Sequence, residues 1–83
     1  RAHTLNPQDP VTVQMLYAAA LSLSRTNADE KRFEDSVRYL KEAVTLGPKE
    51  SEPHRRLAEV YTLMGRPSEA SAEQREAERL GAH

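Results

Sequence analysis

The chain has 83 residues, of which 37% are hydrophobic and 30% charged, a composition that suits a helix-rich domain with solvated polar faces. Its 12 basic and 13 acidic residues nearly cancel, which argues against nucleic acid or an anionic membrane surface as the partner. The lack of cysteine excludes disulfides and thiolate zinc sites, and no apolar run approaches the roughly 20 residues that span a bilayer. We therefore expect a soluble chain, and the sequence does not determine its cellular compartment. Its start at Arg1 suggests a longer parent chain.

A first helix is predicted over residues 10–25. Asp9 can cap its start, and Pro10 is tolerated in the first turn because its missing N–H has no helical partner there. The apolar residues recur at i, i+3, i+4 and i+7, a spacing that places them on one face. This spacing predicts a buried stripe formed by Leu16, Ala19, Ala20 and Leu23.

A second helix is predicted over residues 29–46. Asn27 and Glu30 have the spacing of a capping box, which indicates that the helix starts there. Gly47 and Pro48 stop it, because glycine can take a left-handed cap and proline cannot continue a helix. The side expected to be buried carries Phe33, Ser36, Val37, Leu40, Ala43, Val44 and Leu46.

Two further helices are predicted over residues 52–64 and 67–80. Gly65 ends the third helix and Pro67 opens the fourth. No segment alternates with period two, so the predicted fold class is all-α. The expected apolar positions are Leu57, Ala58, Val60 and Tyr61 in the third helix and Ala70, Ala77 and Leu80 in the fourth, where Gln74 interrupts them.

The two halves of the chain resemble the tetratricopeptide repeat family, whose motif is W-x₂-L-G-x₂-Y, A-x₃-F and P over about 34 residues. The second half matches it with His54, Leu57, Ala58, Tyr61, Ala70 and Gln74. The first half matches it with Leu16, Ala19, Ala20, Leu23, Ser36, Leu40, Ala43 and Pro48. The resemblance implies antiparallel helix hairpins stacked as a short right-handed α-solenoid, with Ala20 and Ala58 at close contacts between helices.

The same resemblance divides the chain into three parts. Residues 1–8 look like the remnant of a preceding repeat, residues 9–48 form one repeat, and residues 49–83 form a repeat at the C-terminal end of a longer array. Pro7 and Pro48 lie 48 − 7 = 41 residues apart, so we expect the first hairpin to be lengthened. The remnant rests on Ala2, Leu5 and Pro7, which repeat the spacing of Ala43, Leu46 and Pro48.

Catalytic chemistry has no visible support in the sequence, and we expect neither an enzyme nor a cofactor. His3, His54 and His83 show no metal-ligand spacing, so His54 is expected at the repeat surface or in the contact between helices. The carboxylates Glu73, Glu76 and Glu78 are expected on a solvated face.

Protein binding is the function that the resemblance implies. In this family the first helix of each hairpin lines a concave groove that binds peptides. The matching positions here are Gln14, Tyr17, Leu21, Glu52, Arg55, Glu59 and Thr62. A plainer interpretation makes Arg55 and Glu59 only an i,i+4 surface pair.

The alternative function is a structural module that self-associates and has no peptide ligand. The apolar helix between Leu16 and Leu23 would be left partly bare at the start of the array. A homodimer that pairs this face with a second copy would cover it.

Overall fold

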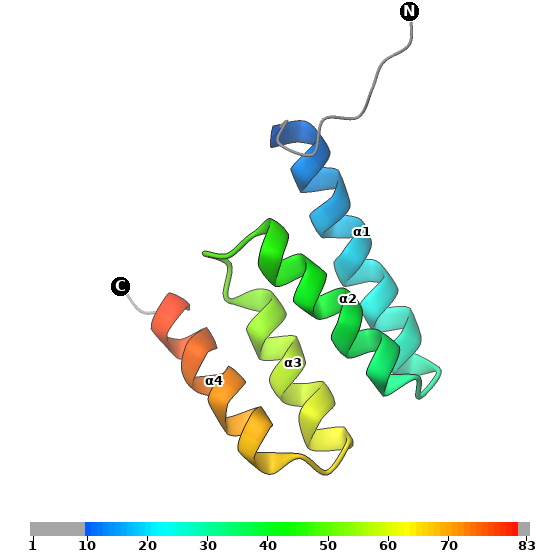
Figure 1. The fold of residues 1–83 in the computed structure, drawn as a ribbon, viewed down its shortest axis with the longest axis vertical. Coiled ribbons are helices and arrows are strands. Elements are labelled where there is room, and N and C mark those ends of the chain that lie inside the picture. The colour runs from blue at the N-terminus through cyan, green and yellow to red at the C-terminus, as the bar shows by residue number, and fades with distance from the viewer. Residues whose placement is uncertain (1–9, 82–83) are drawn as a thin grey trace, which may run out of the picture.

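The computed structural model describes residues 10–81, and this part of the chain forms four helices and no strand. Successive helices run antiparallel and lie side by side, so the chain folds as two hairpins that pack through α2 and α3 (Figure 1). The all-α prediction is confirmed for these residues, whereas the remnant predicted over residues 1–8 and the Asp9 cap lie outside them. The helices are α1 (Pro10–Asp29), α2 (Phe33–Leu46), α3 (Glu52–Leu63) and α4 (Pro67–Gly81).

The first helix continues four residues beyond its predicted end, and the capping box is wrong. Asn27 lies inside α1, where its side-chain amide donates a hydrogen bond to the carbonyl of Leu23 over 2.8 Å. The second helix instead begins at Phe33, and its first turn carries Glu34 and Asp35. Negative charge there is favourable because the free N–H groups give a helix a partly positive start.

The turns inside the two hairpins are equivalent. Lys31 and Gly65 both have positive φ, 63° and 76°, and they lie 65 − 31 = 34 residues apart. In both turns the next residue donates its backbone N–H to the carbonyl five positions back, over 2.7 Å in the first and 2.8 Å in the second. A left-handed residue followed by this bond is the Schellman motif, which closes a helix by satisfying its last carbonyls.

The contact between the helices of each hairpin repeats at the same interval. Ser24 and Ser36 are buried in the first hairpin, and Ala58 and Ala70 are buried in the second. Ala58 lies 58 − 24 = 34 positions after Ser24, and Ala70 lies 70 − 36 = 34 positions after Ser36. The hydroxyl of Ser36 donates to the carbonyl of Ser24 over 2.8 Å, so the two helix backbones approach closely. The hydroxyl of Ser24 in turn donates to the carbonyl of Leu21 over 2.7 Å.

This equivalence corrects the alignment that the sequence suggested for the first hairpin. Ser24, and not Ala20, occupies the position of Ala58, so the predicted alignment is displaced by one helical turn. The additional residues of the first hairpin do not lie in the turn between α1 and α2. The additional residues extend the start of α1, whose first turns project beyond the end of α2 (Figure 1).

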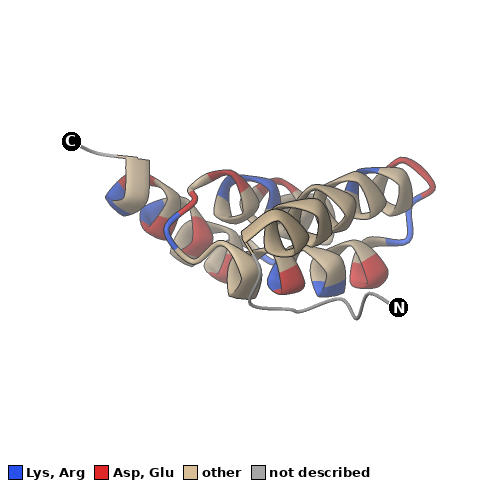
Figure 2. Ribbon diagram, turned by 90° about the horizontal axis from the view of Figure 1, so that it is seen from above, with Lys and Arg blue, Asp and Glu red and all other residues tan. Residues whose placement is uncertain are grey.

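The predicted stripe of α1 is mostly exposed. Ala20 is buried as expected, but Ala19 is exposed and the side chains of Leu16 and Leu23 are 42% and 45% exposed. Residues 10–24 carry no charge, and most of the α1 ribbon is accordingly tan in Figure 2. A helix that is apolar on nearly every side offers two candidate faces, and periodicity alone does not say which one packs.

The core lies mainly between α2 and α3. Leu40 and Leu57 are each 1% exposed, and smaller contributions come from α1 and α4. The predicted apolar sides of α2, α3 and α4 are confirmed, and Gln74 is exposed as its polarity requires. The other buried members of the cluster are Val37, Val60, Tyr61 and Ala70.

The two glycines predicted to end helices behave differently. Gly65 has the left-handed φ expected of a helix-ending glycine, whereas Gly47 has φ −133°, so the left-handed cap predicted for it is wrong. A Cβ on Gly47 would lie 3.1 Å from Cε1 of Tyr17, closer than normal packing allows. Glycine at position 47 therefore makes room for the Tyr17 ring and does not reverse the chain by its own conformation.

Candidate functional site

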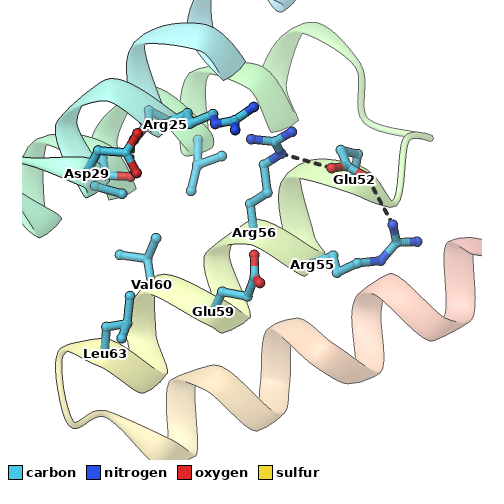
Figure 3. A pocket seen from close by; sticks show the side chains of 12 residues that line it. Arg25, Asp29, Glu52, Arg55, Arg56, Glu59, Val60 and Leu63 are labelled. Carbon is cyan, nitrogen blue, oxygen red and sulfur yellow. Dashed lines mark hydrogen bonds and ion pairs between the residues drawn. The ribbon is translucent and has the colours of Figure 1, made fainter.

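A cavity of about 350 Å³ opens between α1 and α3, and we call it the α1–α3 groove. Its floor includes Ser36 and Leu40 of α2. Its walls come from α1, which carries Arg25 and Asp29, and from the facing side of α3 (Figure 3). This volume lies at the lower end of the range for ligand sites in proteins. The remaining lining residues are Ser24, Arg25, Ala28, Asp29, Glu52, Arg55, Arg56, Glu59, Val60 and Leu63.

The floor of the groove has its polar atoms satisfied. The hydroxyls of Ser24 and Ser36 are used in the hydrogen bonds that join α1 to itself and to α2. Within residues 10–81 no buried side-chain nitrogen or oxygen lacks a partner. The floor therefore presents mainly apolar surface, and polar recognition in the groove has to come from the charged walls.

The charges on the walls are unevenly paired. The carboxylate of Glu52 accepts two hydrogen bonds, one from Arg55 and one from Arg56, each over 2.9 Å. The side chains of Arg25, Asp29 and Glu59 form no hydrogen bond or ion pair within the described part of the chain. The groove consequently offers a ligand the unpaired guanidinium of Arg25 and the unpaired carboxylates of Asp29 and Glu59, beside Arg56, which is paired through its Nε alone.

The structure brings three of the predicted site residues to this groove. Glu52, Arg55 and Glu59 all line it, but Arg55 pairs with Glu52 and not with Glu59. The interpretation of Arg55 and Glu59 as an i,i+4 pair is therefore wrong. Thr62 lines a separate hollow between α3 and α4, and its hydroxyl donates to the carbonyl of Ala58 over 2.8 Å.

The three residues predicted from the first hairpin do not line the groove. Gln14 and Tyr17 line a different hollow beside Gly47, and Leu21 packs against the core. The cause is the displaced alignment, because residues chosen one turn too early on α1 fall on other parts of its surface. The groove residues that sequence reasoning missed on α1 are Arg25 and Asp29, which lie 34 positions before Glu59 and Leu63.

Tyr17 occupies a partly buried site near two carboxylates. Its burial, reinforced by the negative charges of Glu50 and Glu52, raises the pKa of the phenol above its ordinary value of 10.0. Both causes disfavour the phenolate. The side chain is therefore a neutral packing group at the end of the first hairpin, where its ring lies against Gly47.

His54 lies in the contact between α3 and α4. Its Nδ1 is 2.6 Å from a carboxylate oxygen of Glu73, and both side chains are largely buried. The prediction that Glu73 lies on a solvated face is therefore wrong, because this hydrogen bond joins the two helices of the second hairpin. No three histidine or acidic side chains within residues 10–81 are grouped so that they could hold a metal ion.

Comparison of the chain with protein-family models, curated proteins and solved structures finds no match. Within residues 10–81, no helix combines the length and apolar character that are needed to cross a membrane.

Proposed function

We propose that the chain is a protein-interaction module of the tetratricopeptide repeat type, which binds a peptide or protein segment in the α1–α3 groove. The observation that carries this proposal is the groove itself, which presents unpaired charges and an exposed leucine above an apolar floor. Two hairpins with equivalent turns at a 34-residue interval support the repeat assignment, and continued stacking of such hairpins would give a right-handed solenoid. The proposed module has no catalytic role.

Leu63 is the large apolar residue that is exposed on the wall of the groove. It lies on the groove wall, and its side chain is 64% exposed, in an otherwise well-packed helix. A ligand that covers this side chain would remove apolar surface from water, which favours binding. A ligand that buries Leu63 would contact Val60 in the same wall.

The test selects ligands from a display library of random peptides of about twelve residues and measures the affinity of the strongest by fluorescence anisotropy. Leu63→Asp should weaken binding about tenfold, because burial of a leucine contributes over 1 kcal/mol. The matched control is Leu23→Asp, which changes another exposed leucine, outside the groove. Equal affinity for Leu63→Asp and the unmodified chain, or selective loss in Leu23→Asp, would contradict groove binding.

The second candidate function is self-association through the outer face of α1. Four of its large apolar side chains are exposed, and a second copy could pack against them without like-charge repulsion because residues 10–24 carry no charge. Small neighbours such as Ala18 and Ala19 would let two such helices approach closely. The exposed large side chains of this face are Val11, Met15, Leu16 and Leu23.

Sedimentation velocity over a range of concentrations tests this second function. A dimer that Met15→Glu abolishes and Leu63→Glu leaves intact would support it. A chain that remains monomeric at millimolar concentration would refute it.

A further inference from the structure

We infer that the α1–α3 groove selects a segment in which an acidic and a basic side chain flank an apolar one. This inference rests on the proposed function and specifies the chemistry of its ligand. It depends on the order of charges along the groove and on which of them are already neutralised within the chain.

One end of the groove, where Arg25 and Arg56 lie, is basic. Figure 3 shows the guanidinium groups of Arg25 and Arg56 directed to the same end, and Glu52 is the only carboxylate paired there. Glu52 is shared between Arg55 and Arg56, and Arg56 uses only its Nε in that bond. The guanidinium of Arg25 and the outer nitrogens of Arg56 are therefore free to bind a carboxylate, which matches the planar fork of arginine.

The charge reverses about one helical turn farther along both walls. Since α1 and α3 are each antiparallel to α2, they run in the same direction (Figure 1). On α1 the order is Arg25 and then Asp29, and on α3 it is Arg56 and then Glu59. Asp29 and Glu59 have no partner in the described part of the chain, so they can accept hydrogen bonds from a lysine or arginine of the ligand.

The spacing of the two ends limits the ligand. Four residues of a helix advance about 6 Å, which an extended chain covers in about two residues at about 3.3 Å each. The two ligand charges should therefore lie about two residues apart, or three where their long side chains reach back toward the groove charges. An apolar side chain between them would lie over Leu40 and Val60 and would cover Leu63. A segment of this kind places each ligand charge opposite a free charge of the groove.

Segments with charges of one sign fit less well. A wholly acidic segment or a nucleic-acid phosphate run would place negative charge against Asp29 and Glu59. A wholly basic segment would place positive charge against Arg25 and Arg56. Like charges brought together in a partly dry groove oppose binding, so the mixed segment is the favoured occupant.

The experiment uses four dye-labelled peptides with blocked ends and one common frame. Their central residues are Glu-Leu-Ala-Lys, Glu-Leu-Ala-Glu, Lys-Leu-Ala-Lys and Gln-Leu-Ala-Gln. On the unmodified chain the mixed peptide should bind most tightly, by about threefold for each favourable charge pair at the low-salt limit. In Arg25→Glu the preference should move to the Lys/Lys peptide, and in Glu59→Arg it should move to the Glu/Glu peptide.

Two matched variants control for the change in net charge. Arg75→Glu and Glu42→Arg alter exposed residues outside the groove that have no ion pair, so both should keep the preference for the mixed peptide. Equal binding of all four peptides, or the same change of preference in the controls, would overturn the inference while groove binding itself stands. Absence of binding by every peptide at millimolar concentration would also overturn it, and the display experiment with Leu63→Asp decides groove binding separately.

Discussion

The two hairpins have the same backbone plan and different surfaces. Each turn contains a left-handed residue and the same backbone hydrogen bond, at positions 34 apart. Small residues bring the helices together in both hairpins. The first hairpin begins with a long helix that carries no charge over residues 10–24 and whose outer face is exposed. The second hairpin is closed by the hydrogen bond between His54 and Glu73 and is mostly polar outside. The comparison teaches that a few backbone requirements define the hairpin and leave the other faces free to diverge.

The largest effect is expected at one pair of equivalent positions with opposite environments. Leu40 is 1% exposed in the core, whereas Gln74, 34 positions later, is exposed on α4. Leu40→Ala should lower the free energy of unfolding by about 2–5 kcal/mol, and Gln74→Ala should change it by less than about 0.5 kcal/mol. Urea unfolding, monitored by circular dichroism, measures the free energy of unfolding of both variants. Similar losses of stability in the two variants would show that the second hairpin has a covered outer face.

A smaller loss of folding stability is expected when the small residues in the contacts between helices are enlarged. Ala20 and Ala58 are both buried, and leucine at either position should overpack the contact and cost about 1–3 kcal/mol. Ala18→Leu and Ala72→Leu are the controls, since both alanines are exposed on the same kinds of helix. If all four variants unfold at the same urea concentration as the unmodified chain, the two contacts are misplaced.

Substitution of the left-handed residue should change the stability of the chain in opposite directions in the two turns. Gly65→Ala should destabilise the chain by about 1 kcal/mol, because an L-residue is strained at positive φ even though its Cβ would meet no atom within 4 Å. Lys31→Gly removes the same strain and should stabilise by about 0.5 kcal/mol after the greater freedom of the unfolded glycine is counted. Thermal unfolding measures both, and a loss in Lys31→Gly would contradict the equivalence of the turns.

The smallest effect concerns Tyr17 at alkaline pH. Because burial raises the pKa of its phenol above 10.0, the folded chain keeps a proton that the unfolded chain loses. The associated stability is complete below about pH 10 and is lost as the pH rises through the folded value. Urea unfolding between about pH 8 and pH 11 should show a shallower decline in Tyr17→Phe than in the unmodified chain. An identical decline would mean that Tyr17 is not buried in solution.

The second, third and fourth helices could be predicted because each has one apolar and one polar side. In α4, for example, Ala70 and Ala77 mark the buried side, and the polar residue Gln74, which interrupts that row in the sequence, is exposed. The packed face of α1 could not be predicted, because Leu16 and Leu23 form an equally regular stripe that stays exposed. The start of the second helix was predicted wrongly from Asn27 and Glu30, because the spacing of a capping box also occurs by chance among polar residues and Asn27 lies inside α1.

The repeat interval was hidden by substitutions at its most diagnostic positions. Lysine stands at position 31 where Gly65 marks the second turn, and Ser24 and Ser36 replace the alanines that mark the second contact. The α1 side of the groove was missed for the same reason, because Arg25 and Asp29 differ in type from Glu59 and Leu63. Only the spatial equivalence of the turns shows that these residues occupy matching places.

Chemical-shift mapping by nuclear magnetic resonance tests the proposed function most directly. The ¹⁵N-labelled chain is titrated with the strongest peptide from the display selection. We predict that the perturbed backbone amides will concentrate in residues 24–29 of α1 and 52–63 of α3, which form the walls of the groove. Perturbations centred on residues 11–23, around the exposed side chains of Val11, Met15 and Leu16, would contradict the account and move the binding function to the outer face of α1.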